Sequence, residues 1–195
     1  MKNIGLSGGI GSGKTTVSKI LLENGIPVYD SDTRAKYIIN NSSEVKKSII
    51  DNFGKVSFIN NILNKKYISK LIFNDKIALK KINSIVHPYV YNDFLEWKKS
   101  VFFKYVIYES ALIFESGSYK KNDYNILVIS DEDERIKRVI RRDELNKNDV
   151  VVRINNQWQD EKKIPLADYI INNDSILKIN QRVLDLVDTL NKLFK

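Results

Sequence analysis

The sequence predicts an α/β fold in which a five-stranded, mainly parallel sheet is flanked by helices. The first observation is the alternation of short apolar segments of strand character with segments of helical period. The second is a glycine-rich loop that joins the first predicted strand to the first predicted helix. The strand segments are residues 2–7, 26–29, 103–109, 125–129 and 166–173.

The glycine-rich loop spans residues 8–15, Gly-Gly-Ile-Gly-Ser-Gly-Lys-Thr, and fits the P-loop pattern G-x-x-x-x-G-K-[ST]. Glycines let the backbone turn its N–H groups around phosphate oxygens, and the following helix adds partial positive charge. Lys14 is expected to reach the β- and γ-phosphates of ATP, and the Thr15 hydroxyl to hold Mg²⁺. A merely flexible turn would leave both residues unexplained. The expected nucleotide-binding residues are Gly9, Ile10, Gly11, Ser12, Gly13, Lys14, Thr15 and Thr16.

The composition is that of one globular chain without a membrane anchor. With 195 residues it can bury one core and accommodate a small insertion. Hydrophobic residues make up 43% and charged residues 29% of the sequence. No run approaches the about 18 apolar residues of a membrane span. Glycines interrupt the N-terminal apolar patch, so it is not a signal peptide. We therefore expect a soluble protein with no membrane partner.

Cysteine content and charge narrow the functional class further. The absence of cysteine excludes disulfides and thiolate chemistry, and suits a reducing cytoplasm. A formal net charge of +8 could indicate a nucleic-acid partner. Lys and Arg are, however, spread along the chain beside Asp and Glu. We therefore expect a basic surface that attracts phosphorylated small molecules, and no nucleic-acid partner.

Two carboxylates follow the second predicted strand. Asn24-Gly25 ends the first helix, residues 26–29 form a short strand, and Asp30-Ser31-Asp32 comes next. Carboxylates at this end of a strand lie where α/β sheets bind ligands, so one of them could accept a proton from a substrate hydroxyl. Asp and Ser also cap helices well, and residues 33–39 are helical in pattern. The residues alone leave both roles open.

Residues 43–100 contain no strand of the kind found in a sheet core. The pattern predicts helices over 44–53, 65–73, 76–86 and 89–99, with a break between the last two at His87-Pro88. Such a helical block between the second and third strands resembles the substrate-binding insertion of small P-loop kinases. His87 is the single histidine, and a histidine before proline more often braces a turn than binds a ligand.

The third strand ends in an acid, Glu109. P-loop proteins place a carboxylate that helps to hold Mg²⁺ at this point. An ordinary strand-terminal acid is the alternative. Given the P-loop, we favour the metal-side role for Glu109.

An arginine-rich helix follows the fourth strand and opens with the acidic run 131–134. Arg135, Arg138 and Arg142 share one face of it, with Arg141 beside them. They form either a solvated face with pairs such as Glu134–Arg138 or a lid that clamps ATP. A second helix over 149–157 would carry Arg153 into the same lid.

The C-terminal segment completes the sheet. Residues 166–173 predict the fifth strand and a turn. The last helix has apolar residues at alternating three- and four-residue steps, but for too short a stretch to form a coiled coil, so we expect it to pack on the sheet. These positions are Ile176, Ile179, Val183, Leu186, Leu190 and Leu193.

Taken together, these residues resemble the dephospho-CoA kinase family over nearly the whole chain. The resemblance lies in segments 5–16, 25–32, 87–88, 112–115 and 167–173, and in the arginine-bearing helix. The chain departs from the family at Ala111, where a proline is usual, at Asn64-Lys65 in place of Asp-Arg, and around residues 157–162. These departures concern the fine positioning of substrate and lid.

The resemblance implies a P-loop kinase fold and ATP-dependent phosphorylation of the ribose 3′-hydroxyl of dephospho-CoA. It implies a core of residues 1–32, 101–130 and 164–195, a helical substrate-binding insertion at about 33–100, and a lid at about 131–163. Asp32 would be the general base, Arg138 and Arg142 the lid arginines that act with Lys14, and Thr15 and Glu109 the Mg²⁺ ligands. Asp32, His87 and Glu109 would contact the substrate.

The same resemblance implies a cytoplasmic monomer whose partners are ATP and dephospho-CoA. The alternative within the fold is another small-molecule P-loop kinase, such as one acting on nucleoside monophosphates. An alternative from a different class, suggested by the P-loop and the charge of +8, is a nucleotide-dependent switch or binding protein, or a nucleic-acid-binding ATPase.

Overall fold

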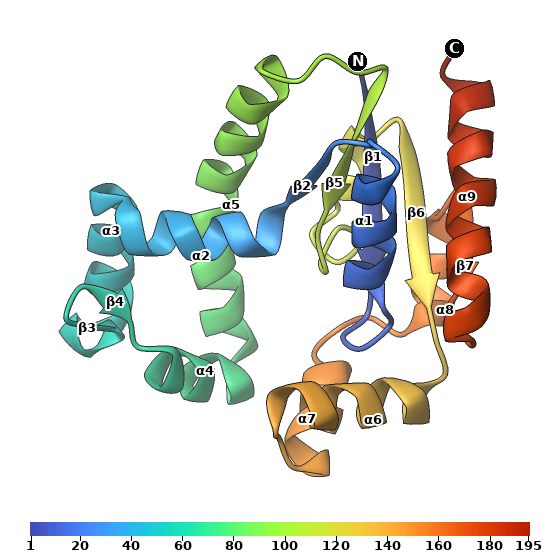
Figure 1. Ribbon diagram of the computed structural model, residues 1–195. Coiled ribbons are helices and arrows are strands. Elements are labelled where there is room, and N and C mark those ends of the chain that lie inside the picture. The colour runs from blue at the N-terminus through green and yellow to red at the C-terminus, as the bar shows by residue number, and fades with distance from the viewer. The chain divides into compact units, whose positions relative to one another are not determined.

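The computed structural model describes the backbone of all 195 residues and every side chain except those of Phe73, Asn74, Lys76 and Ile176. The chain divides into two compact units. The first combines Met1–Asp30 with Val101–Lys195 and holds the main sheet, whereas the second, Ser31–Ser100, is mostly helical (Figure 1).

The main sheet has five strands in the order β2-β5-β1-β6-β7, and every neighbouring pair is parallel. This confirms the predicted α/β architecture. Because the strands are parallel, their carboxyl ends meet at one edge of the sheet, where such folds bind ligands. The strands are β1 (Lys2–Gly8), β2 (Val28–Asp30), β5 (Tyr105–Glu109), β6 (Tyr124–Ile129) and β7 (Tyr169–Asn172).

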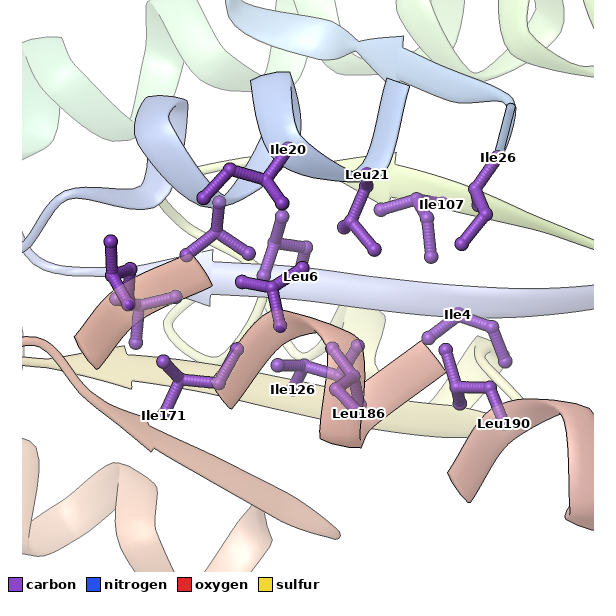
Figure 2. Packing of buried hydrophobic residues seen from close by; sticks show 14 of the residues in the cluster. Ile4, Leu6, Ile20, Leu21, Ile26, Ile107, Ile126, Ile171, Leu186 and Leu190 are labelled. Carbon is purple, nitrogen blue, oxygen red and sulfur yellow. The ribbon is translucent and has the colours of Figure 1, made fainter. Parts of the chain in front are cut away.

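One hydrophobic core joins the sheet to the first and last helices, α1 (Lys14–Glu23) and α9 (Ile176–Leu193). Ile4 and Leu6 of the central strand are fully buried, and Leu186 and Leu190 of α9 pack into the same cluster (Figure 2). Each such side chain contributes about 1.5–3 kcal/mol by leaving water. The predicted packing of the last helix on the sheet is confirmed, although Leu193 at its end is exposed.

Three further helices of this unit follow β6: α6 (Glu132–Asp143), α7 (Lys147–Asn155) and the single turn α8 (Asp160–Lys163). The Asp131 side chain caps α6 by accepting the N–H groups of Asp133 and Glu134. Apolar side chains of α6 and α7 form a second cluster, and Ile10 of the P-loop packs against it. The members of that cluster are Ile136, Val139, Val150 and Ile154.

The second unit consists of α2 (Ser31–Asn41), α3 (Ser43–Phe53), α4 (Lys65–Asn74) and α5 (Lys76–Lys99), with a two-residue hairpin of β3 (Phe58–Ile59) and β4 (Ile62–Leu63). The predicted helices over 33–39, 44–53 and 65–73 are therefore confirmed. Ser42, Asn64 and Asp75 cap α3, α4 and α5 through their side chains. The hairpin turns at Asn60 and Asn61, both left-handed, as this turn type requires.

The predicted break at His87-Pro88 is wrong, because α5 runs through both residues. Proline in a helix removes one backbone hydrogen bond and is unfavourable by about 3 kcal/mol. Packing on both sides of Pro88 offsets this cost, since Ile82 and Val86 before it and Val90 and Phe94 after it are all buried. Tertiary contacts thus override the local signal.

Within the part of the chain that the structure describes, every helix is too short or too polar to cross a membrane.

Candidate active site

The P-loop leaves β1 at Gly8 and enters α1 at Lys14. Gly13, the N-cap of α1, has a φ of +97°, a backbone conformation that favours glycine. A Cβ atom on Gly13 would also overlap the side-chain amide of Asn173, and one on Gly9 would overlap the guanidinium of Arg135. The glycines therefore let two polar side chains approach the loop from outside.

Three consecutive carbonyl groups of the loop are held by these and neighbouring side chains. The Ile10 carbonyl accepts from Arg135 Nε at 3.0 Å, that of Gly11 from Arg138 Nη1 at 3.3 Å, and that of Ser12 from Asn173 Nδ2 at 2.8 Å. In a planar trans peptide the N–H of the next residue points the opposite way.

The loop amides are therefore turned to the side away from these side chains. The Ser12 N–H closes the loop on the Gly9 carbonyl at 3.0 Å, whereas the N–H groups of Gly11 and Gly13 are directed away from the side chains that hold the carbonyls. The first N–H groups of α1 have no acceptor within their own helix. Amides arranged in this way fit the oxygens of a triphosphate.

Lys14 forms a buried ion pair at the edge of the sheet. Its Nζ atom lies 2.7 Å from Glu109 Oε1, and the two side chains are 11% and 5% exposed. Ser18 of α1 donates to the other carboxylate oxygen of Glu109 at 2.5 Å. The parallel register sets Glu109, the last residue of β5, beside Leu6 of β1, two residues before the loop. The predicted phosphate-side lysine and the predicted metal-side acid thus lie together.

The residues at this edge suit a magnesium ion that arrives with a nucleotide. Among the described side chains, no group of three or more His, Asp or Glu is arranged to hold a metal by itself. Mg²⁺ in kinases binds through one or two protein oxygens plus phosphate oxygens and water. The exposed Thr15 at the start of α1 and the Glu109 carboxylate offer oxygens of this kind.

The predicted arginine face of α6 divides into three environments. Arg135 is buried. Arg138 donates hydrogen bonds to the Gly11 carbonyl of the loop and, at 3.0 Å, to the Asn173 carbonyl outside it. Arg142 lies away from these contacts, is mostly exposed, and binds Asp143 through two hydrogen bonds of 2.7 and 3.0 Å. Asp143 also lies 3.6 Å from Arg153 of α7.

The interpretation of this face as solvated fits Arg142 but not Arg135. On the surface of this helix Glu134 forms an ion pair with Lys137 at 2.7 Å, whereas Glu134–Arg138 is the pair that the spacing predicts.

In the second unit, Asp32 and His87 lie close enough to interact electrostatically. Asp32 is the second residue of α2, and Asp30 directly precedes that helix. Packing around the imidazole lowers the pKa of His87, and the Asp32 charge acts in the opposite direction. The His87 side chain is nevertheless exposed overall. Nearby on the same two helices, Arg34 of α2 binds Asp93 of α5 through Nε at 2.8 Å.

The site also contains side chains for which the sequence did not predict a contact with the P-loop. Arg135 and Asn173 hold loop carbonyls, and Gln157 Oε1 accepts the Ile10 N–H at 2.8 Å. Arg135 shares a helix face with Arg138, and Asn173 ends one of the family-like segments, so both carried a signal. Gln157 had none, because its role depends on a contact with a loop far away in the sequence.

A P-loop whose lysine pairs with a strand-end acid, and whose outer side carries arginines from a following helix, defines a P-loop phosphotransferase. Similarity to known proteins narrows this class to one family. A family model described as dephospho-CoA kinase matches residues 2–178. The dephospho-CoA kinase of Fusobacterium nucleatum is 41% identical over 176 residues, covering 90% of this chain and 91% of that relative. This chain belongs to the dephospho-CoA kinase family.

Solved structures share the fold. A crystal structure from Thermus thermophilus is 30% identical, with a TM-score of 0.85 and coverage of 96% of both chains. The dephospho-CoA kinase from Campylobacter jejuni is 24% identical, with a TM-score of 0.67 and coverage of 97% of both chains. The second similarity supports the predicted P-loop kinase fold.

Proposed function

We propose that this chain transfers the γ-phosphoryl group of ATP to the ribose 3′-hydroxyl of dephospho-CoA, producing CoA and ADP. The observation that carries the proposal is the dephospho-CoA kinase match over residues 2–178, which includes both the P-loop and the Asp-Ser-Asp segment. In the reaction, the 3′-oxygen forms a bond to the γ-phosphorus, the bond from that phosphorus to the β–γ bridging oxygen breaks, and the hydroxyl proton leaves to a base.

The P-loop supplies the phosphate site in this proposal. Residues 9–16 form the binding loop, in which amides turned away from the holding side chains, such as those of Gly11 and Gly13, and the Lys14 ammonium bind the β- and γ-phosphates. Lys14 rests against Glu109, and its ammonium has three N–H donors, so it bonds phosphate oxygens when ATP binds. Thr15 and Glu109 would hold Mg²⁺, which would neutralise charge on the phosphates. Arg138 and Arg142 balance the charge of the transferring group.

The acceptor site is assigned to the helical unit, about residues 33–100, together with the preceding Asp32. Asp32 takes the proton of the 3′-hydroxyl, and His87 and Glu109 are assigned as further contacts of the acceptor. Residues 131–163 act as the lid. Phosphoryl transfer depends mainly on positioning and electrostatics, so this small set of residues suffices.

The decisive experiment is an acceptor screen with purified protein, ATP and Mg²⁺. Dephospho-CoA, AMP, CMP and shikimate are offered separately, and ADP release is measured. We expect turnover with dephospho-CoA and only background with the other three. Turnover with a nucleotide alone would favour the nucleoside monophosphate kinase alternative and overturn the proposal.

We also propose that the protein is a cytoplasmic monomer without a nucleic-acid partner. Light scattering after size-exclusion chromatography tests the oligomeric state. Tight DNA or RNA binding that weakens steeply with salt and stimulates ATP hydrolysis would favour the nucleic-acid-dependent ATPase alternative instead.

A further inference from the structure

A cluster of four charged side chains, two of them buried and two partly buried, reaches the P-loop through Arg135. Arg135 Nη1 lies 3.5 Å from Asp160 Oδ2, and Lys163 Nζ lies 3.7 Å from Asp160 Oδ1 and 3.4 Å from Glu115 Oε1. The Lys163 side chain is 0% exposed. Two positive and two negative charges balance each other, and none of the four has a role in the proposed phosphoryl transfer. We call Arg135, Asp160, Lys163 and Glu115 the buried ionic cluster.

The buried ionic cluster reaches the P-loop through Ile10. Arg135 Nε donates to the Ile10 carbonyl at 3.0 Å, while the Ile10 N–H donates to Gln157 Oε1 at 2.8 Å. The Ile10 side chain packs against the apolar residues of α6 and α7. The backbone and the side chain of Ile10 are therefore both held by the segment that follows β6.

Holding this carbonyl sets the direction of the next amide. The peptide between Ile10 and Gly11 is planar and trans, so fixing the carbonyl toward Arg135 directs the Gly11 N–H to the opposite side. That is the side on which the proposed triphosphate binds. A guanidinium can bond the carbonyl through Nε and face a carboxylate through Nη1 at once, whereas a lysine ammonium is a single point charge.

We propose that Arg135 is a positioning residue for ATP: it orients the Gly11 amide toward the phosphates, and the buried ionic cluster holds Arg135 in place. The inference rests on the proposed use of this loop for ATP. Arg135 acts through the Ile10 backbone, so it differs from Arg138 and Arg142, which are assigned to the transferring group. A purely structural ion pair would stabilise the fold without changing ATP affinity.

Arg135→Lys separates these two roles because it keeps the positive charge but loses the guanidinium, which bonds the Ile10 carbonyl and faces Asp160 at the same time. ATP binding is measured by calorimetry in Mg²⁺ without acceptor, and unfolding is followed in parallel. We expect ATP affinity to fall about tenfold, as for the loss of one hydrogen bond to a charged group, with dephospho-CoA affinity unchanged. Lys137→Gln, on the same helix but in an exposed pair with Glu134, is the matched control and should bind ATP normally. A folded Arg135→Lys protein with unchanged ATP affinity would overturn the proposal.

Two further variants test the route of the effect. Gln157→Met removes the other hydrogen bond to Ile10 without touching a buried charge, so it remains informative where Arg135→Lys does not fold. We expect weaker ATP binding, and unchanged affinity would contradict the inference. Asp160→Asn removes the anion beside Arg135, and the losses in Asp160→Asn and Arg135→Lys should not add in the double variant. Additive losses would exclude Asp160 as the anchor.

These measurements stay separate from the test of the proposed function. ATP binding needs no acceptor, so a failed acceptor screen would refute dephospho-CoA as the substrate and leave the positioning of the loop by Arg135 intact. Unchanged ATP binding in the variants would refute the positioning role alone.

Discussion

The P-loop and the helical unit of residues 31–100 reach their structures in different ways. The loop has no regular secondary structure, and side chains more than a hundred residues away in the sequence hold its carbonyls. The helices of the second unit instead begin at local caps such as Ser42, Asn64 and Asp75. The phosphate side thus depends on distant contacts, and the proposed acceptor side on local sequence. Substitutions on the phosphate side and substitutions in the helical unit should therefore have different effects on ATP affinity and on stability.

Lys14→Ala should have the largest effect. Turnover should fall by about a thousandfold or more, since the lysine stabilises charge on the phosphates. Glu109 would also lose its buried partner, at a cost of about 3 kcal/mol in the free energy of unfolding. Steady-state kinetics and denaturant unfolding measure the two effects.

Adding Glu109→Gln to Lys14→Ala distinguishes the loss of activity from the loss of stability. The double variant should recover most of the stability, because no uncompensated charge remains buried, and none of the activity. Full activity of Lys14→Ala would contradict the assignment of the loop.

Asp32→Asn should have the next largest effect and should leave the phosphate side intact. Loss of a general base lowers kcat by about a hundredfold or more. The ATP affinity, measured by calorimetry, should not change, because the P-loop residues are untouched. A change confined to ATP affinity would instead assign Asp32 a structural or Mg²⁺-linked role.

Pro88→Ala tests the local side of the comparison. Alanine restores the backbone N–H inside α5, so the free energy of unfolding should rise by about 1–3 kcal/mol. Chemical denaturation measures this, and ATP affinity should stay constant. Pro165→Ala is the matched control, because Pro165 lies at the start of a 3₁₀ turn and occupies no helix interior. A less stable Pro88→Ala protein would show that Pro88 has a packing role that the helix does not reveal.

The smallest effect concerns pH. Burial lowers the pKa of His87 below its ordinary value of 6.5, so near that pH the unfolded chain binds more protons than the folded one. The contribution of His87 to stability is therefore present above pH 6.5 and is lost as the pH falls toward the lowered folded pKa. His87→Asn should remove this loss, so the Tm of the wild type relative to that of the variant should fall from pH 8 to pH 5. A difference independent of pH would contradict the lowered pKa.

Much of the fold could be predicted from the sequence, because its signals are local. Strand segments, helix caps and the P-loop each follow from neighbouring residues. The continuity of α5 could not, since Pro88 signals a break and only burial of Val86 and Val90 overrides it. The small hairpin at Asn60-Asn61 was missed because two-residue strands carry almost no periodic pattern.

In the candidate site, too, the features with a local signal could be predicted and those that depend on distant contacts could not. Lys14 and Glu109 were predicted as neighbours in function, and the parallel register brings them together. Arg135 and Arg142 lie on the same face of α6, so the sequence pattern does not distinguish them. Their environments differ because Arg135 bonds the P-loop whereas Arg142 bonds Asp143. The contact of Gln157 could not be predicted, since its partner is a backbone N–H and no pattern of residue types records such a contact.

The outer side of the P-loop has a consequence for how the family can vary. Gly9 faces the Arg135 guanidinium and Gly13 faces the Asn173 amide, each at a separation that admits no Cβ. A larger residue at position 9 would require a shorter one at position 135, whereas at position 13 the φ of +97° strains any larger residue even where Asn173 is shortened. Positions 9 and 135 should therefore change together during evolution, and a library that varies this pair jointly should recover folded combinations that substitutions at position 9 alone never reach.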